Sequence, residues 1–395
     1  MTGIIALSQI YICIDNRILI CIVTAMNIAA TPVVAPAIPG RPLLKRIARS
    51  LVAPDAFDFW ASRLHSTWSW DRPLARIVAR QAESSDTFTL LLRPNRHWRG
   101  FRAGQHLNIG AEIDGSRVTR SYSLSDAPRA DGRIAITVKA IPGGKLSQHL
   151  CHAAKPGDVL TLGPAFGDMC LPEKPEGAWL FLAAGSGITP MMAMIRAQAA
   201  QGMPIPIALA YWARSRAEQC FVDELRDLAA RHANFRVDFV LTRDAAAADC
   251  RHGRIDVQWL STFAPDLHQR RVFACGPDGF VAAARALAAG RAVVFHAEAF
   301  TPPPRVETEG GSVQLTLAAS GRTLDVPRGT ALLTALEDAG LKPASGCRMG
   351  ICNTCACGKL AGTTRHLHTG DIEREPVSAL RLCVHSASSD LILDL

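Results

Sequence analysis

The pattern of apolar and polar residues changes its period along the chain, and each change predicts a different kind of structure. Between residues 75 and 162, short alternating runs such as those at 87–92, 106–109 and 134–139 are separated by Gly, Pro and Asp. Alternation with period two, interrupted by frequent turn residues, is typical of antiparallel sheets. We therefore expect an antiparallel β-barrel over residues 71–172.

A continuous apolar run at residues 179–184 begins a region with a different pattern. A strand that is apolar on both faces is typical of a parallel sheet covered by helices. Further apolar runs, separated by helical patterns, stand at residues 205–211, 237–241, 272–274 and 293–295. This alternation predicts a doubly wound α/β domain over residues 177–300.

A linker at residues 301–311, rich in Pro and Gly, separates this domain from a smaller one at 312–395. In the smaller domain, residues 313–317 and 323–326 alternate like the two strands of a hairpin. Residues 330–339 have helical spacing.

The first seventy residues predict no catalytic domain. Residues 4–23 are apolar, but Asp, Asn and Arg interrupt them at 15–17, and charge is costly at the centre of a bilayer. We expect no spanning helix there, and both an appendage without catalytic importance and a weak membrane-surface anchor stay open. Residues 1–43 are interpreted as this appendage and a proline-rich tether. Residues 44–70 predict an amphipathic helical segment, which either packs on the protein or presents a basic patch to a membrane or an acidic partner.

Composition narrows the class of protein. The chain has 395 residues, of which 48% are hydrophobic and 20% charged, and this excludes a disordered or fibrous protein. The net charge of +8 is not gathered into a basic stripe, so nucleic-acid binding is not expected. Five of the twelve cysteines lie in the last fifty residues, without a secretory signal at the start. Clustered thiols of this kind predict a metal or cluster site in a cytoplasmic protein, with peripheral contact at the inner face of the membrane left open.

The spacing Cys347-x4-Cys352-x2-Cys355, with Cys383 further on, is the strongest chemical signal. A [2Fe–2S] cluster needs four thiolates that converge on two irons, and a tight loop supplies three of them. Structural zinc is the weaker alternative, because its ligands usually come as two separated cysteine pairs. The segment resembles the plant-type ferredoxins, which implies a β-grasp fold with these four cysteines as ligands. Cys357 is interpreted as a small core residue.

Two motifs in the barrel region together fit a flavin cradle. Tyr122 can cover the flavin ring and Ser123 can hydrogen-bond its N5, while Arg120 can bind the phosphate. About twenty residues later, a Gly-Gly-x-x-Ser segment opens a short helix whose backbone N–H groups can face phosphate. The two motifs in this order resemble the ferredoxin–NAD(P)H reductase family, which implies FAD rather than FMN. The expected FAD-binding residues are Arg120, Ser121, Tyr122, Ser123, Val138, Lys139, Gly144, Lys145, Leu146 and Ser147.

A glycine-rich turn between a strand and a helix is the candidate nucleotide site, because backbone N–H groups and the helix dipole favour a pyrophosphate there. Pro190 replaces the third glycine of the usual fingerprint, so the turn alone could be mere chain reversal. The resembled family carries this shortened turn followed by Cys-Gly-Pro, which implies that Cys275 abuts the nicotinamide; a buried small residue is the alternative. The expected nucleotide-binding residues are Gly185, Ser186, Gly187, Thr189, Cys275, Gly276 and Pro277.

Cofactor preference and proton transfer depend on four further residues. Arg214 and Arg216 follow a strand end that lacks Asp or Glu, which favours the 2′-phosphate of NADPH; NADH and solvated arginines stay open. Glu298 and Phe300 match the ending of similar reductases, which implies a proton relay and a flavin cover, with ordinary packing as the alternative. Ser123, Cys275 and Glu298 are therefore the candidate catalytic residues.

Together these motifs predict an oxidoreductase that passes electrons from NADPH through FAD to a [2Fe–2S] cluster and on to a protein acceptor. Residues 44–60 and 98–105 resemble the reductases that serve membrane fatty-acid desaturases, which implies a desaturase partner. Reductases of ring-hydroxylating or alkane oxygenases share the same modules and are the alternative. A redox sensor without turnover is a third hypothesis.

Overall fold

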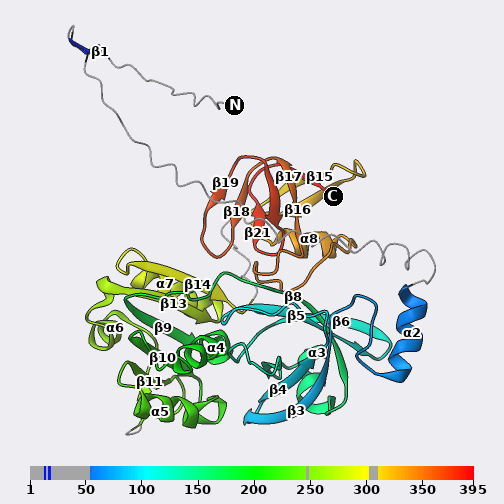
Figure 1. The fold of residues 1–395 in the computed structure, drawn as a ribbon. Coiled ribbons are helices and arrows are strands. Elements are labelled where there is room, and N and C mark those ends of the chain that lie inside the picture. The colour runs from blue at the N-terminus through cyan, green and yellow to red at the C-terminus, as the bar shows by residue number, and fades with distance from the viewer. Residues whose placement is uncertain (1–12, 15–16, 19–53, 246–248, 302–309) are drawn as a thin grey trace, which may run out of the picture. The chain divides into compact units, whose positions relative to one another are not determined.

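The computed structural model describes residues 13–14, 17–18, 54–245, 249–301 and 310–395 (Figure 1). The chain divides into two units, residues 1–53 and 54–395. In the first unit, β1 (Cys13–Ile14) and β2 (Arg17–Ile18) pair in antiparallel orientation, and the rest of the expected appendage and tether lies outside the described residues. Within the described ranges, no helix is long and apolar enough to cross a membrane.

Helix α2 (Pro54–Leu64) opens the second unit. Pro54 suits a first helical position, because its missing N–H needs no partner there. Asp58 ties the helix to the chain that follows, since its carboxylate accepts hydrogen bonds from the Trp70 backbone (2.6 Å) and the Arg72 side chain (2.7 Å). The helical segment was predicted over residues 44–70, but the helix ends at Leu64, and residues 65–70 form turns and irregular chain. Residues 44–53 lie outside the described part.

The barrel is a six-stranded antiparallel sheet in the order β6-β5-β8-β3-β4-β7, and it confirms the predicted architecture. A bridge between Leu124 and Ile136 joins the chain just beyond one edge strand to the other edge strand, so the sheet closes on itself. Helix α3 (Lys145–Gln148) continues as a π turn over His149–Ala153, and Leu146 and Leu150 pack from it into the barrel core. The strands are β3 (Leu74–Ser84), β4 (Thr87–Pro94), β5 (His106–Ile113), β6 (Ser116–Ser123), β7 (Ile134–Lys139) and β8 (Val159–Phe166).

The doubly wound α/β domain is also confirmed, with six parallel strands in the order β12-β11-β10-β9-β13-β14. Alternate residues of β9 join two hydrophobic clusters: Phe181 packs with α4 and α5, and Leu182 with α6 and α7, so helices cover both faces (Figure 1). The strands are β9 (Ala178–Ala184), β10 (Ile207–Ala213), β11 (Phe235–Leu241), β12 (Arg251–His252), β13 (Arg270–Gly276) and β14 (Val294–Ala299). The helices are α4 (Ile188–Ala199), α5 (Val222–Arg231), α6 (Val257–Phe263) and α7 (Asp278–Ala288). Short 3-10 turns lie at Gly185–Gly187, Arg216–Glu218 and Leu267–Gln269.

One strand of this domain is longer than its apolar pattern suggested. The apolar run itself covers only residues 293–295, whereas β14 continues to Ala299. Glu298 is only 8% exposed and pairs in register with Cys275 of β13. A buried carboxylate interrupts the apolar pattern without ending the strand, because the ladder depends on backbone groups.

The third domain has a five-stranded sheet in the order β16-β15-β22-β17-β20, and helix α8 (Leu332–Asp338) packs on its core. The predicted hairpin is present as β15 (Ser312–Leu317) and β16 (Thr323–Pro327), and β15 also pairs in parallel with β22. This mixed sheet with one packed helix confirms the predicted β-grasp domain. The other strands are β17 (Ala356–Ala361), β18 (Thr364–His366), β19 (Ile372–Glu373), β20 (Val377–Arg381), β21 (His385–Ala387) and β22 (Leu391–Asp394).

Candidate functional site

The four cysteines predicted as cluster ligands lie together. Cys347, Cys352 and Cys355 stand on the loop between α8 and β17, and Cys383 on the connection between β20 and β21. The Cys347 side chain contacts those of Cys352 and Cys383, and Cys355 also contacts Cys383. Cys352 is partly exposed and the other three are buried. A loop and a neighbouring turn thus present four thiols to one place.

Backbone N–H groups of the loop point at the cysteine sulfurs. The nitrogens of Met349 and Ile351 each lie 3.3 Å from the Cys347 sulfur, and the Gly350 nitrogen lies 3.2 Å from the Cys383 sulfur. The pKa of the Cys347 thiol lies far below its ordinary value, first because neighbouring thiols donate hydrogen bonds to it and then because the backbone does. The same hydrogen bonds between thiols raise the pKa of Cys352 and Cys383, so one proton-sharing group of four thiols lies where backbone N–H groups can stabilise thiolate, the form that binds metal.

Glycines make the close approach of this loop feasible. A Cβ on Gly346 would lie 2.8 Å from the Cys352 sulfur, and one on Gly350 would lie 2.9 Å from the Val384 side chain. A [2Fe–2S] cluster needs four thiolates for its two irons and accepts N–H bonds, so the four gathered thiols and the N–H groups around them fit it.

The end of β6 presents the first half of the predicted flavin cradle. Ser123 is 4% exposed, and its hydroxyl has no hydrogen-bond partner among the described residues. Tyr122 packs against the barrel core, where burial raises the pKa of its phenol, and Arg120 is exposed. Ser121 instead donates across the sheet to Asn108 (2.5 Å). An unpartnered buried hydroxyl costs about 1–3 kcal/mol, so this strand end fits a group that would satisfy it, as FAD would.

The second half of the cradle is held by its own serine. The Ser147 hydroxyl accepts from the Ile141 backbone (3.2 Å) and donates to the Gly144 carbonyl (3.3 Å). A Cβ on Gly144 would lie 2.4 Å from that hydroxyl, so a larger residue there would displace the serine from these two hydrogen bonds. Leu146 is buried and Lys145 is the first helical residue. The serine therefore shapes the loop, and the backbone N–H groups of the first turn are the groups that stay available to phosphate.

The two nucleotide motifs meet at the carboxyl ends of β9 and β13, where the strand order reverses. Open α/β sheets bind ligands at such a switch point. A Cβ on Gly187 would lie only 2.1 Å from the Cys275 carbonyl oxygen, and one on Gly276 would lie 2.8 Å from the Ala184 side chain. Cys275 is fully buried, and burial raises the pKa of its thiol well above the ordinary value, so the side chain is neutral.

The turn that precedes α4 is also well defined. Gly185 has a φ of +55°, a conformation that favours glycine. Thr189 closes the turn by donating its hydroxyl proton to the Ser186 carbonyl (2.9 Å). Pro190 lies in the first turn of α4, where a missing N–H has no cost, and Pro277 directly precedes α7. The proline that departs from the usual fingerprint is therefore compatible with a helix start.

The residues predicted to select NADPH are paired with carboxylates. Arg214 contacts Glu218 (2.7 Å), and Lys139 of the barrel contacts the same carboxylate (2.9 Å). Arg216 contacts Asp249 (2.7 Å). The sequence reasoning considered only the strand end and missed both carboxylates: Glu218 lies four residues after Arg214 in the chain, whereas only the fold brings Asp249 to Arg216. A 2′-phosphate would have to compete with them, so the preference for NADPH stays a prediction.

His106 was missed by the sequence reasoning and lies between two candidate catalytic residues. It stands on β5 directly opposite Ser123, and its Nε2 lies 3.3 Å from the Glu298 carboxylate. Phe166 and Phe300 pack around the imidazole, with ring centroids at 6.0 and 5.7 Å. A histidine at the first position of a predicted strand, followed by apolar Leu107 and Ile109, was the available signal. Phe300, proposed to cover the flavin, thus also contacts His106.

A cavity of about 220 Å³ lies where parts of all three domains meet. It is lined by Asp168 after the barrel strands, Glu298 of β14, and Met349 and Ile351 of the cluster loop. His368 of the third domain also lines it and contacts Asp278 at the start of α7 (2.5 Å). The cluster loop and the nucleotide domain therefore share one polar cavity.

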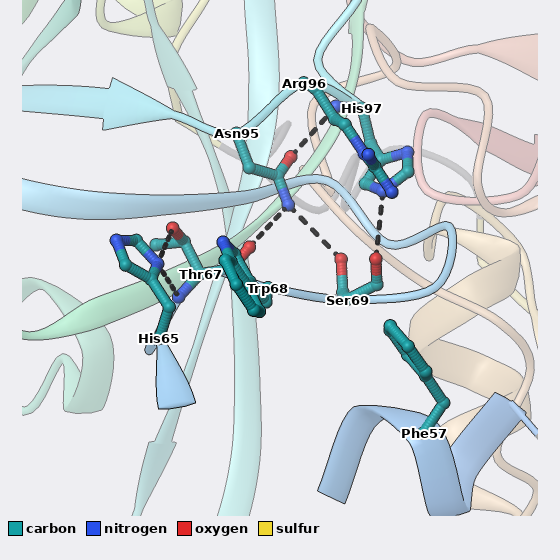
Figure 2. A pocket seen from close by; sticks show the side chains of 8 residues that line it. All are labelled: Phe57, His65, Thr67, Trp68, Ser69, Asn95, Arg96 and His97. Carbon is teal, nitrogen blue, oxygen red and sulfur yellow. Dashed lines mark hydrogen bonds between the residues drawn. The ribbon is translucent and has the colours of Figure 1, made fainter. Parts of the chain in front are cut away.

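A second cavity, of about 420 Å³, lies beside α2 (Figure 2). Asn95 donates to the Thr67 carbonyl (3.0 Å) and the Ser69 hydroxyl (3.2 Å), and His97 contacts the Ser69 carbonyl (3.0 Å). Figure 2 shows these groups turned toward one another. Its polar groups thus fasten the connection between α2 and β3, and none of the predicted site residues lies there.

Comparison with known proteins gives matches to three families in succession. They are described as an oxidoreductase FAD-binding domain at residues 75–169, an oxidoreductase NAD-binding domain at 181–286, and a 2Fe-2S iron-sulfur cluster binding domain at 315–387. These matches confirm the predicted cofactor classes: FAD, a nicotinamide nucleotide and a [2Fe–2S] cluster.

Two relatives match along nearly their whole length. An NADPH oxidoreductase of Mycobacterium tuberculosis is 34% identical over 90% of this chain and 93% of its own. A glycine betaine monooxygenase reductase subunit of Pseudomonas aeruginosa is 30% identical over 83% of this chain and 96% of its own. Phthalate dioxygenase reductase shares the fold, with a TM-score of 0.55 and 24% identity over 82% of this chain and 97% of that one.

Proposed function

The chain belongs to the family of modular oxidoreductases that join an FAD-binding domain, an NAD-binding domain and a 2Fe-2S domain, and we propose that it supplies electrons from NADPH to an oxygenase. The name of the Pseudomonas relative specifies a monooxygenase, and this supports an oxygenase as acceptor. The desaturase partner, our first prediction, is named by neither of these two relatives, so the alternative is the better supported. The name of the Mycobacterium relative specifies NADPH and supports that donor.

When bound, FAD and the cluster supply the conversion of a hydride into single electrons. The residues of the chain bind and orient the reactants. The turn at Gly185–Gly187 and the start of α4 hold the nucleotide phosphates, and the neutral Cys275 thiol packs against the nicotinamide. The unpartnered Ser123 hydroxyl holds the flavin ring from the opposite domain, and Arg120 binds its phosphate.

The observation that carries the proposal is the shared cavity of the three domains. Glu298 pairs with Cys275 across β13 and β14, and the same Glu298 lines the cavity with Met349 and Ile351 of the cluster loop. The residues proposed to hold the nicotinamide are thus close in the fold to the residues proposed to hold the cluster. This arrangement suits electron transfer within one chain and needs no diffusing ferredoxin.

Anaerobic titration with NADPH and with NADH, followed by visible and EPR spectra, tests the internal pathway. We expect the flavin to bleach and the cluster signal to appear, with NADPH effective at lower concentration. A protein in which the flavin is reduced while the cluster stays oxidised would contradict the pathway. NADPH-dependent reduction of cytochrome c then separates a reductase from the redox-sensor hypothesis, because a sensor would show little turnover.

The acceptor is tested by reconstitution. The reduced protein is mixed with purified oxygenase components and, in a parallel reaction, with desaturase-containing membranes and an acyl-CoA substrate. We expect product with at least one oxygenase and none with the membranes. Product only with the desaturase would restore our first prediction and overturn the oxygenase proposal.

Peripheral membrane contact is a separate part of the proposal. The side chains of Trp60, Leu64 and Trp68, on α2 and just after it, are 67%, 81% and 54% exposed. Arg63 lies among them, with its guanidinium 3.7 Å from the Phe59 ring centre. Exposed aromatic and basic residues together favour the interface of a bilayer, which supports contact of this face with anionic lipid.

A further inference from the structure

An imidazole of the third domain contacts a carboxylate of the nucleotide domain. The Nδ1 atom of His368 lies 2.5 Å from the Asp278 carboxylate, and the two side chains are only 11% and 23% exposed. A contact shielded in this way is screened less by water and salt than one on the open surface. The other His368 ring nitrogen is buried without a partner among the described residues, and the side chain lines the shared cavity. The imidazole is therefore enclosed between the two domains.

On the nucleotide domain, the carboxylate belongs to a fixed helix start. Asp278 is the first residue of α7 and directly follows Pro277, the end of the Cys-Gly-Pro motif. A negative charge is favourable at the N-terminus of a helix. The Asp278 backbone N–H also donates to the hydroxyl of Thr301, which begins the linker to the third domain (2.9 Å). The residue that contacts the third domain is therefore tied to the proposed nicotinamide site on one side and to the linker on the other.

On the third domain, a tight turn between β18 and β19 holds the imidazole. The Nδ1 atom of His366 accepts hydrogen bonds from the backbone N–H groups of His368 (3.3 Å) and Thr369 (3.2 Å). Burial lowers the pKa of His366 to about 4, so its ring is neutral and has an acceptor nitrogen for these groups. The Thr369 hydroxyl donates to Asp371 (2.6 Å) and closes the turn from its other side. The backbone that carries His368 is therefore fixed.

The same turn is connected to the predicted cluster site. The Leu367 backbone N–H donates to the Val384 carbonyl (2.8 Å), and Val384 directly follows Cys383, the fourth predicted ligand. Strands β18 and β21, which flank this hydrogen bond, pair in antiparallel orientation. A short series of contacts thus runs from the Cys-Gly-Pro motif through Asp278 and His368 to the chain beside Cys383. The contact between the domains joins two segments that the proposed function places at the donor and at the acceptor of the electron.

We propose that the contact between His368 and Asp278 is a latch that holds the cluster domain on the nucleotide domain in the position needed for electron transfer. Domains joined by a small polar interface move relative to one another unless a contact holds them. One electron passes from reduced flavin to oxidised cluster without a bond being formed or broken, so this step depends on the position of the third domain. Hydride transfer involves only the first two domains and does not. The inference rests on the proposed function and adds to it two positioning residues.

The test removes the latch from each side. His368→Ala and Asp278→Ala each delete one partner, and a double variant deletes both. His368→Asn keeps an N–H donor near the place of the Nδ1 atom and is the conservative variant. His268→Ala, at an exposed histidine of the nucleotide domain, is the matched control. FAD content is measured by absorbance and cluster content by EPR after dithionite reduction. The unmodified protein is titrated with NADPH first, so that failure of the proposed function is recognised before the latch is judged.

Stopped-flow absorbance follows flavin bleaching by NADPH, and rapid-freeze EPR follows cluster reduction. We expect both alanine variants to bleach at the unmodified rate and to reduce the cluster about tenfold more slowly, the order of effect of one lost contact between neighbouring residues. The double variant should be no slower than either single variant, because all three lack the same contact. His368→Asn should retain most of the rate, and His268→Ala should match the unmodified protein. A general loss of structure would instead slow both steps and add up in the double variant.

A second measurement does not depend on turnover. In the oxidised holoprotein, Asp278→Ala should speed amide hydrogen exchange in the turn at residues 366–371, and His368→Ala should speed it at the start of α7, because each residue holds the other domain. If His368→Ala loses the cluster, Asp278→Ala decides, since it lies in the other domain. Normal cluster reduction in an alanine variant that retains FAD and cluster would overturn the proposal. Additive losses in the double variant, or unchanged exchange in the opposite domain, would overturn it as well.

Discussion

The closest approach between the two nucleotide motifs supplies a sharp prediction for Gly187→Ala. The added Cβ would lie 2.1 Å from the Cys275 carbonyl oxygen, 2.4 Å from its carbonyl carbon and 2.7 Å from the Gly276 nitrogen. Ordinary contacts begin at about 3.4 Å, so one backbone segment would have to move by about 1.3 Å. All three neighbours are backbone atoms of β13 or its end, so no side chain can rotate away to absorb the change.

Two consequences follow, and they are measured separately. Overpacking of this kind costs about 1–3 kcal/mol, which urea denaturation of the variant would show as a lower free energy of unfolding. A displacement near 1 Å at the site that orients the nicotinamide should slow hydride transfer about 100-fold. Stopped-flow measurement of flavin bleaching by NADPH reports that step directly, because it precedes cluster reduction.

Gly279→Ala is the matched control. Gly279 lies at the start of α7, only three residues after Gly276, and a Cβ there would meet no atom within 4 Å. We expect stability to change by less than about 1 kcal/mol, in the stabilising direction, because alanine favours helix. If Gly187→Ala leaves both the free energy of unfolding and the bleaching rate within the range of this control, the close approach of the two motifs is not required.

The remaining predictions concern the cluster, the nucleotide and the membrane. Cys383→Ser should abolish the reduced-cluster EPR signal while NADPH still bleaches the flavin; a retained signal would exclude this residue as a ligand. Arg214→Ala combined with Arg216→Ala should raise the KM for NADPH about tenfold with little change for NADH; equal changes for both would contradict the proposed 2′-phosphate contact. Trp60→Ala combined with Leu64→Ala should abolish co-flotation with phosphatidylserine vesicles, and no co-flotation of the unmodified protein would exclude this membrane face.

The period of the apolar pattern predicted where one domain gives way to the next. It predicted the bounds of individual strands less evenly. The alternating run at 134–139 coincides with β7, and its alternate residues Ile134, Ile136 and Val138 belong to the barrel core. The end of β14 was misjudged, because Glu298 is a buried carboxylate inside a strand. A polar residue in the sequence indicates an exposed position only when no other part of the fold covers it. Glu298 is covered, because His106 and the cavity residues of the third domain lie beside it.

The amino-acid sequence alone was enough to predict the three domains and the type of cluster site. Three of the four predicted thiolate ligands belong to one short loop, so their spacing can be read directly from the sequence. It also determined the serine and cysteine motifs, since each ends a strand. Only the tertiary structure decided which distant groups share an environment. His106 and Glu298, 3.3 Å apart, stand on different sheets, and Lys139 and Arg214 meet at one carboxylate although they belong to different domains. Such contacts depend on how separate sheets pack, and no local pattern of apolar and polar residues encodes that.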